Sequence, residues 1–245
     1  MQKVVIVHPY IKSKSAKLKL EHQFKEICSL AESCEMQVVD VAIAPLAKPN
    51  HGTYIGRGKI AELKTLISEH GVKQIIVNTS LTSIQNRNLN QALCCEVIDR
   101  MTLILHIFAM RASSKEGQLQ VELARLKYQR SRLARAWTHL ERQRGGTSST
   151  GGPGERQIEI DRRLIDDKIC KLEQDLSKVA KRRQLHRKNR KNAIVALVGY
   201  TNAGKSTLFN LLTNSKVMAE DKLFATLDPT IRLANVDKDF SVLFV

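Results

Sequence analysis

The chain has 245 residues, of which 42% are hydrophobic and 26% are charged. These values are ordinary for a globular protein with room for one or two domains, each burying its own core. Forty lysine and arginine residues against 24 acidic residues give a formal net charge of +16. Such a surface favours nucleic acid as a partner over a membrane surface, because the basic segments lack a bulky aromatic face.

The sequence shows no pattern of a secretion signal or a membrane anchor. Met1–Val7 leads directly into His8 and Pro9, unlike a signal peptide. The longest apolar stretch, Leu103–Met110, is interrupted by His106 and is too short to span a bilayer. The five cysteines form no C-x-x-C pair and show no metal-ligand spacing with histidine, which is typical of reduced thiols. We expect a cytoplasmic, monomeric protein without a membrane span.

Residues 1–99 alternate between short apolar segments and helical patterns, which predicts a small parallel sheet covered by helices. The first strand is expected to end at Pro9 and the second before Pro45, while Gly71 is placed to stop a helix. The expected strands are Val4–Val7, Gln37–Ile43, Gln74–Asn78 and Glu96–Ile98, and the expected helices are Ala16–Glu32, Gly58–His70 and Ser83–Leu93.

Residues 100–191 predict an antiparallel helical hairpin. One helix is expected from about Arg100 to Arg144 and a second from about Ile158 to Asn189. The tip between them, residues 145–154, has five glycines and one proline in ten residues, which prevent a helix. Apolar seams at heptad-like spacing predict that the two helices pack together. The seams are Leu119, Leu123, Leu126, Leu133, Trp137 and Leu140 on the first helix, and Ile158, Ile165, Ile169, Leu172, Leu176 and Val179 on the second.

The end of the second helix is strongly cationic, with seven lysines and arginines in the eleven residues Lys181–Lys191. The dipole of the helix explains two or three cations at its carboxyl end. The remaining charges favour a surface that faces phosphates and whose binding weakens as salt rises. The candidate RNA-binding residues are Lys181, Arg182, Arg183, Arg187, Lys188, Arg190 and Lys191.

Residues 192–245 begin a third unit that contains a phosphate-loop pattern. Ala193–Val198 predicts a buried strand and Ser206–Thr213 predicts a helix. Between them, GYTNAGKS at residues 199–206 fits G-x-x-x-x-G-K-[ST] in the strand–loop–helix setting that this pattern requires.

Each part of this loop has a physical role. Gly199 and Gly204 allow backbone N–H groups to approach and cradle phosphates. Lys205 is expected to reach the β- and γ-phosphates, and the hydroxyl of Ser206 is expected to bind Mg²⁺. The expected nucleotide-binding residues here are Gly199, Tyr200, Thr201, Asn202, Ala203, Gly204, Lys205, Ser206 and Thr207.

Several longer segments carry a family resemblance. GYTNAGKSTLFN at residues 199–210 is followed by LFATLDPTIR at residues 223–232. Ahead of them, in order, are YIGRGKIAEL at residues 54–63, EGQLQVELARLKYQRSRL at residues 116–133 and GGPGERQIEIDRRLI at residues 151–165. Together these segments resemble the HflX GTPases of the Obg-HflX superfamily over nearly the whole chain.

The resemblance implies an α/β fold class with three parts: an amino-terminal α/β domain, a helical hairpin and a P-loop (Ras-like) G domain. It implies hydrolysis of GTP to GDP with Mg²⁺, binding to the large ribosomal subunit and its RNA, and a role in splitting or rescuing stalled ribosomes under stress. Thr226 takes the place of the switch threonine that contacts Mg²⁺ and the γ-phosphate, with Thr230 as the alternative. Lys205 and Thr226 are then the catalytic residues. The expected first switch, also part of the GTP site, is Phe224, Ala225, Thr226, Leu227 and Asp228.

The sequence also departs from the family pattern. The tip has the small polar residues Ser148, Ser149 and Thr150, and His106 stands where an acidic residue is common. The D-x-x-G and N-K-x-D motifs are expected beyond Ser241–Val245, so residues 192–245 correspond to an incomplete G domain, which needs about 150 residues. We therefore expect a gene fragment or a partial record of a longer protein, a last strand that is exposed and apolar, and poor GTP hydrolysis.

Three alternatives stay open. Guanine preference rests on the resemblance alone, so a P-loop ATPase is one alternative reading. A non-enzymatic RNA-binding or ribosome-binding fragment is another, because the amino-terminal domain and the hairpin can bind RNA without a nucleotide. YIGRGK at residues 54–59 is either a second anion-binding loop or a tight strand-to-helix turn.

Overall fold

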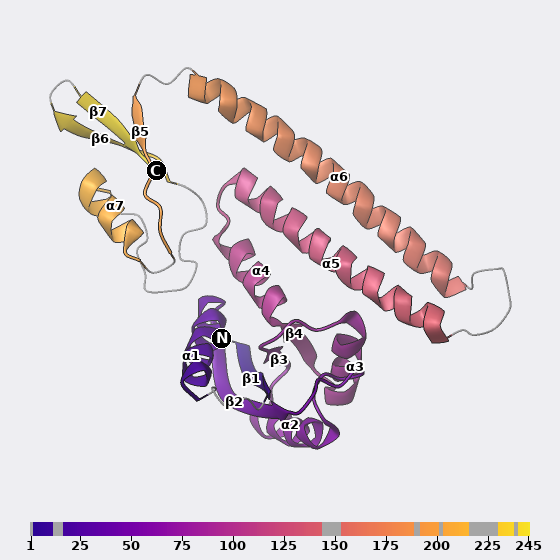
Figure 1. Cartoon of the computed structure of the whole chain (residues 1–245). Coiled ribbons are helices and arrows are strands. Elements are labelled where there is room, and N and C mark those ends of the chain that lie inside the picture. The colour runs from indigo at the N-terminus through magenta and orange to yellow at the C-terminus, as the bar shows by residue number, and fades with distance from the viewer. Residues whose placement is uncertain are drawn as a thin grey trace.

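The computed structural model describes residues 2–11, 17–143, 153–188, 192–200, 203–215, 230–237 and 240–245. Figure 1 shows an amino-terminal α/β unit, two long helices lying side by side, and a small sheet with one helix at the carboxyl-terminal end. This arrangement confirms the predicted α/β class and the predicted order of the three parts.

The amino-terminal unit is built on a four-stranded parallel sheet with the strand order β2-β1-β3-β4. Two helices cover each face, so the sheet forms the middle layer (Figure 1). The strands are β1 (Gln2–Ile11), β2 (Met36–Leu46), β3 (Gln74–Val77) and β4 (Glu96–Asp99), and the helices are α1 (Lys17–Ser33), α2 (Arg57–His70), α3 (Ser83–Leu93) and α4 (Arg100–Arg111).

The apolar run of β1 explains why the sheet is covered on both faces. Val5 and Val7 pack into the core under α2 and α3, whereas Val4 and Ile6 pack into the core under α1 and α4. All four side chains are fully buried. Successive side chains of a strand point to opposite faces, so an uninterrupted apolar run requires cover on both of them. The predicted parallel sheet is confirmed.

The two prolines that were expected to end strands lie inside them. β1 continues through Pro9, and β2 continues through Pro45. β2 is an edge strand, and β1 pairs with β3 only as far as Val7. Proline is tolerated at a sheet edge because no ladder hydrogen bond to a further strand is lost there. The predicted end points of both strands were therefore wrong, whereas Gly71 ends α2 as predicted, with φ of 61°.

The single long helix expected from about Arg100 to Arg144 was also wrong, because the chain forms α4 and then α5 (Lys115–Gln143). Ala112 is extended, and the hydroxyl of Ser114 accepts the Gly117 N–H at 2.9 Å, which starts a new helix. Leu103 and Ile107 of α4 belong to the core under α1. α4 therefore packs with the amino-terminal unit, and we place the start of the hairpin after α4 rather than at residue 100.

Helix α5 packs against α6 (Pro153–Lys188) as an antiparallel pair. Leu126 and Ile169 from the predicted seams are buried. Three ion pairs join the helices in antiparallel order: Lys127–Glu173 at 2.8 Å, Arg130–Asp166 at 2.7 Å and Arg183–Glu116 at 2.8 Å.

The glycine-rich tip is shorter than predicted at its carboxyl end. Helix α6 already begins at Pro153, where the fixed φ of proline suits the first helical position. Residues 144–152, with Ser148, Ser149 and Thr150, lie outside the described residues, as do the side chains of Trp137, Leu140 and Ile158.

The third unit is a three-stranded sheet with the order β5-β7-β6 and one helix, α7. β7 is parallel to β5 and antiparallel to β6, a strand that the sequence patterns did not predict. The last strand was expected to be exposed, but β7 is the middle strand and Val242 is buried. The bounds are β5 (Ala193–Val195), α7 (Lys205–Thr213), β6 (Arg232–Asp237) and β7 (Phe240–Phe244).

Within the described residues, no helix combines the length and the apolar composition needed to cross a membrane.

A buried histidine, His8, and a half-buried one, His106, make the stability of the amino-terminal unit depend on pH. Burial lowers the pKa of His8, and nearby Arg100 lowers it further, while a hydrogen bond with Gln23 opposes both. Asn78 Nδ2 lies 2.8 Å from His8 Nδ1, which must be unprotonated to accept this bond. Burial also lowers the pKa of His106. The folded state therefore binds these protons less well than the unfolded chain does.

We predict that the free energy of unfolding is constant above the unfolded histidine pKa and falls as the pH drops below about 6.5. Denaturant titrations at several pH values between 5 and 8 would measure this slope. His8→Gln should reduce this slope, and the contribution of His106 should remain. A free energy of unfolding that rises on acidification would contradict the prediction.

Candidate nucleotide site and cationic hairpin

The phosphate loop leads from the end of β5 into α7, as the sequence pattern requires. Gly204 is the N-cap of α7 and has φ of +77°, in the left-handed region. Its carbonyl accepts the Leu208 N–H at 3.0 Å, the first bond of the helix. Gly204 is thus the turning point at which the chain enters the helix, and α7 begins one residue earlier than predicted, at Lys205.

Lys205 lies along the inside of this loop. Its Nζ donates to the Tyr200 carbonyl at 2.6 Å, and the Ala203 N–H donates to the same carbonyl at 3.3 Å. A Cβ at Gly199 would lie 3.5 Å from Lys205 Cδ, so this glycine lies against the lysine stem. The ammonium group is therefore held beside the first N–H groups of a helix, and this combination can bind a phosphate.

The residues present also fit a magnesium ion. Mg²⁺ in nucleotide sites is held by one or two protein oxygens together with phosphates and waters. Ser206, in the first turn of α7, supplies one hydroxyl directly after Lys205. Within the described ranges, no group of three or more histidine, cysteine, aspartate or glutamate side chains forms a metal site of its own. A metal bound here would therefore depend on the nucleotide for most of its ligands.

Part of the predicted site lies outside the described residues. Thr201 and Asn202 of the loop fall there, and so does the whole first switch, residues 224–228, with Thr226. Thr230, the alternative switch threonine, is described and half-buried just before β6. The structure thus brings together Gly199, Tyr200 and residues 203–207.

The structure divides the predicted cations of α6 into two kinds. Arg183 Nε pairs with a carboxylate oxygen of Glu116 at 2.8 Å, across the base of the hairpin. Lys181, Arg182 and Arg187 are exposed. Glu116 was not predicted as a partner, because its pairing depends on how the two helices align. Lys188 ends α6, and Arg190 and Lys191 lie outside the described residues.

A shallow groove of about 410 Å³ lies at this base of the hairpin. Cationic and amide side chains line it, so its chemistry suits an anion. The lining residues are Glu116, Ser177, Ala180, Lys181, Arg183, Gln184 and Arg187.

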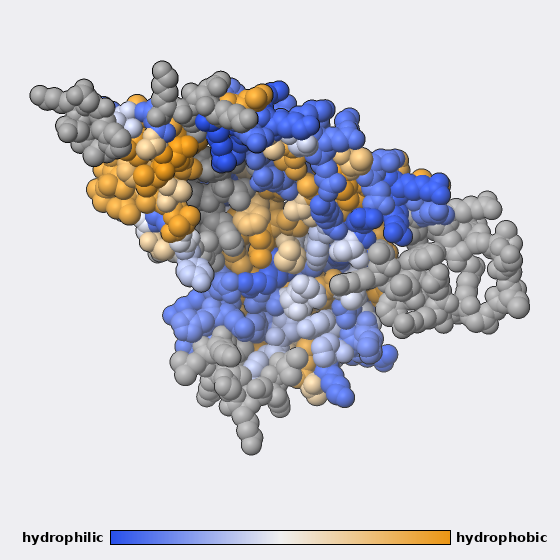
Figure 2. Space-filling view, turned by 45° about the horizontal axis from the view of Figure 1, so that its top comes forward, coloured by the Kyte–Doolittle hydropathy of each residue, from blue (hydrophilic) through white to orange (hydrophobic). Residues whose placement is uncertain are grey.

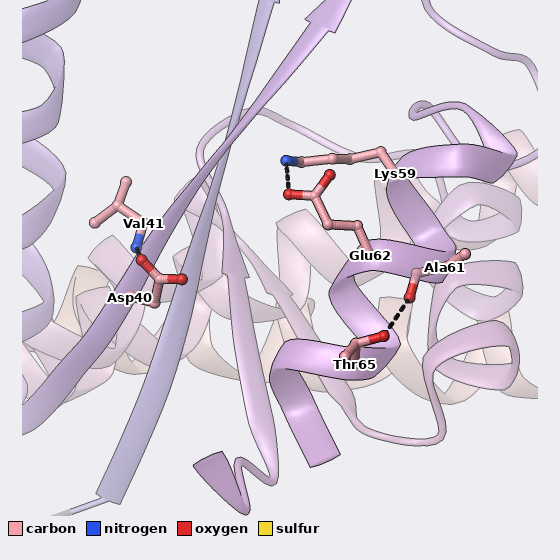
Figure 3. A network of polar contacts seen from close by, with 6 residues as sticks. All are labelled: Asp40, Val41, Lys59, Ala61, Glu62 and Thr65. Carbon is pink, nitrogen blue, oxygen red and sulfur yellow. Dashed lines mark hydrogen bonds and ion pairs between the residues drawn. The ribbon is translucent and has the colours of Figure 1, made fainter. Parts of the chain in front are cut away.

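The YIGRGK segment forms a tight connection between the sheet and α2. Asn50 and Tyr54 form an isolated antiparallel bridge, and Gly56 is the extended N-cap of α2. Lys59 Nζ pairs with Glu62 Oε1 at 2.5 Å, and Figure 3 shows both side chains reaching toward each other beside the strands. With its lysine already neutralised, the segment has the geometry of a strand-to-helix turn.

The third unit exposes an apolar face. Ile194, Leu243 and Leu233 are cross-strand neighbours in one row, so they point to the same side of the sheet. Ile194 is 47% exposed and Leu233 is 54% exposed. On the other side, Val242 is buried, as is Phe209 of α7. Figure 2 shows hydrophobic residues gathered over this unit, in contrast to the hydrophilic outer surface of α6.

Three family profiles match successive parts of the chain. A GTP-binding GTPase N-terminal region matches residues 21–109, a GTP-binding GTPase middle region matches residues 111–190, and a 50S ribosome-binding GTPase matches residues 194–245. The boundaries between them agree with the end of α4 and the start of β5.

Curated relatives agree with these profiles. GTPase HflX of Magnetococcus marinus is 53% identical over 214 residues, covering 86% of this chain and 50% of the relative. GTPase HflX of Escherichia coli is 43% identical over 238 residues, covering 96% of this chain and 55% of the relative. The chain belongs to the HflX GTPase family. It spans about half the length of the HflX relatives that it matches.

Solved structures show the same fold. A crystal structure of a GTP-binding protein from the archaeon Sulfolobus solfataricus in complex with GDP aligns with a TM-score of 0.52 and 24% identity. The alignment covers 100% of this HflX-family chain and 60% of that one. A structure of an SsGBP–GDP complex aligns with a TM-score of 0.57, also at 24% identity, and covers 61% of that chain.

Two glycines allow a matched test of the loop geometry, because an added Cβ meets open space at both Gly204 and Gly58. Only Gly204 has positive φ. We predict that Gly204→Ala weakens nucleotide binding and costs about 1–2 kcal/mol locally, whereas Gly58→Ala, inside α2, stabilises by about 0.5–1 kcal/mol. Chemical denaturation and titration with a fluorescent guanine nucleotide would measure both. Equal effects of the two changes would contradict the role given to Gly204.

Proposed function

We propose that this chain is the ribosome-binding and phosphate-binding part of a Mg²⁺-dependent GTPase. The observation that carries the proposal is the loop between β5 and α7, where the left-handed Gly204 directs the chain into α7 and Lys205 lies beside the helix N-terminus. A family profile for ribosome-binding GTPases covers the same residues, which supports guanine nucleotide over ATP.

In this proposal each loop residue has a defined task. The N–H groups at the start of α7 hold the phosphates, and Lys205 moves from the Tyr200 carbonyl to the β- and γ-phosphates. Ser206 would supply a hydroxyl to Mg²⁺, and the bound ion would neutralise negative charge on the phosphates. Thr226 closes over the γ-phosphate and lets go after hydrolysis, so that the first switch reports which nucleotide is bound.

The cationic end of α6 would couple this site to ribosomal RNA. Only a few residues separate Lys188, at the end of α6, from Ala193, at the start of β5. The groove lined by Lys181 and Arg187 therefore lies on the helix that leads into the strand before the phosphate loop. A near-complete switch between two docked states requires on the order of 5 kcal/mol of differential binding. Such a switch would suit the splitting or rescue of stalled ribosomes under stress.

A second function is favoured by the exposed apolar face of the third unit. With Ile194 and Leu233 uncovered, this unit is less completely packed than the amino-terminal unit and the hairpin. The 245-residue chain would then act as an RNA-binding or ribosome-binding protein without GTP turnover. An ATP-dependent version of the switch is the remaining alternative, and nucleotide competition distinguishes it.

We predict that Lys205→Ala lowers the affinity for GTP at least tenfold, because the charge that meets the β- and γ-phosphates is lost. Competition between a fluorescent GTP analogue and unlabelled GTP or ATP would measure affinity and base preference. Preference for ATP would overturn the guanine assignment. Loss of ribosome association in Lys205→Ala indicates a nucleotide-gated switch, and unchanged association indicates the RNA-binding alternative.

The two kinds of cation on α6 lead to a separate prediction. Replacing Lys181 and Arg187 together by glutamine should weaken RNA binding and reduce the slope of log affinity against log salt by about 1–2, because two phosphate contacts are lost. Arg183→Gln is the control on the same helix, since its charge is already paired with Glu116. This change should lower the stability of the hairpin and leave the slope of log affinity against log salt nearly unchanged.

Filter binding of a ribosomal RNA fragment across a range of salt concentrations would provide these slopes. If Arg183→Gln reduces the slope as much as the double variant does, the division of the cations into paired and phosphate-facing groups is wrong.

A further inference from the structure

A buried carboxylate lies where the amino-terminal sheet meets the hairpin. Asp99, the last residue of β4, is 0% exposed. The neighbouring cation in the sequence, Arg100, is turned toward Asn78 and Glu26 instead. A buried carboxylate must be satisfied by hydrogen bonds, and the donors that surround it indicate which parts of the fold it holds together.

The two oxygens of Asp99 serve different parts of the molecule. Oδ1 accepts the Thr102 N–H at 2.9 Å and the Thr102 hydroxyl at 2.5 Å, which caps α4. Oδ2 accepts the Leu81 N–H at 3.3 Å and the hydroxyl of Tyr128. Tyr128 lies on α5, the first hairpin helix. Capping α4 requires only Oδ1, so the contact of Oδ2 with the hairpin is additional to the cap.

A second contact fixes the same turn of α5. The Ser83 hydroxyl, at the start of α3, donates to the Arg132 carbonyl at 2.5 Å. The Arg132 guanidinium lies over the Tyr128 ring, 5.5 Å from its centroid. One turn of α5 is therefore held to both β4 and α3 by polar contacts. The hairpin is joined to the sheet at the carboxyl end of its strands, the edge at which α/β folds commonly bind ligands.

We propose that the Asp99–Tyr128 hydrogen bond is a joint that fixes the direction of the hairpin on the amino-terminal unit. The amino-terminal unit and α5 then move as one rigid body. Asp99 and Tyr128 are therefore positioning residues for the cationic end of α6. The joint follows from the described contacts alone, while its effect on RNA rests on the function proposed above.

The direction of the hairpin depends on this bond because a hydrogen bond to a charged group is strong and local. Removing the Tyr128 hydroxyl leaves Oδ2 with only the longer bond from Leu81 among its donors on the described residues. The capping bonds at Oδ1 are untouched, so the amino-terminal unit stays folded. The turn of α5 around Tyr128 should then release about tenfold to a hundredfold more often.

Hydrogen–deuterium exchange of the 245-residue chain, read by mass spectrometry, tests the joint. In Tyr128→Phe, peptides covering residues 124–133 and 79–83 should exchange about tenfold or more faster, while peptides from β1 and β3 should be unchanged. Tyr10→Phe is the matched control, because the Tyr10 hydroxyl has no hydrogen-bond partner in the described part of the chain. The joint is refuted by unchanged exchange in residues 124–133, or by equally faster exchange in β1 and β3, which indicates a general loss of stability.

RNA binding provides an independent readout. If the joint positions the cations, Tyr128→Phe should weaken binding of a ribosomal RNA fragment several-fold without changing its salt slope, since no phosphate contact is removed. Unchanged affinity despite faster exchange at residues 124–133 would show that the joint has no role in binding. Absence of RNA binding in the parent chain, with the exchange result intact, would refute the proposed function and leave the joint standing.

Discussion

Parallel strands require apolar cover on both faces, and most of this structure follows from how each sheet meets that constraint. In the amino-terminal unit, Val4 and Ile6 lie under one helix pair and Val5 and Val7 under the other. In the third unit, Val242 is buried, while Ile194 and Leu233 on the opposite face of the sheet are exposed. The first sheet is therefore a layer covered on both faces with its own core, and the second sheet is only partly covered.

The same constraint explains where polar chemistry is found. In the amino-terminal sheet, strands that are buried along their length present polar groups mainly where they end, whereas β5, which was predicted as a buried strand, is exposed at all three of its residues. At the carboxyl end of β4, Asp99 caps α4 and receives Tyr128, so this end serves as a joint with the hairpin. Between β5 and α7, the chain turns at Gly204, and the first N–H groups of α7 are the proposed contacts for a phosphate. The sheet edge of the amino-terminal unit therefore holds helix α5 of the hairpin, whereas the loop of the third unit is suited to a nucleotide.

The hairpin stands between these two units in the chain. Its apolar seam determines that the helices pack, but the ion pairs Arg130–Asp166 and Arg183–Glu116 reveal their alignment. This alignment changes the interpretation of the cationic helix end. One of its arginines neutralises Glu116 inside the hairpin, so the cations available to a partner are fewer than the composition indicates. Net charge alone predicts a polyanionic partner, and pairing decides which residues can meet it.

The sequence by itself determined the parallel sheet, the helix stop at Gly71, the packed hairpin and the position of the phosphate loop, because these depend on local patterns. Apolar runs, a left-handed glycine and the G-x-x-x-x-G-K-[ST] spacing act over a few residues. Only the tertiary structure decided that Pro9 and Pro45 lie within strands, that the chain divides into α4 and α5 at Ala112, and that the last strand is central. Each of these depends on partners distant in the chain: a neighbouring strand, the core under α1, and the edge provided by β6. The Asp99–Tyr128 bond belongs with them, since 29 residues separate its two groups and packing alone brings them together.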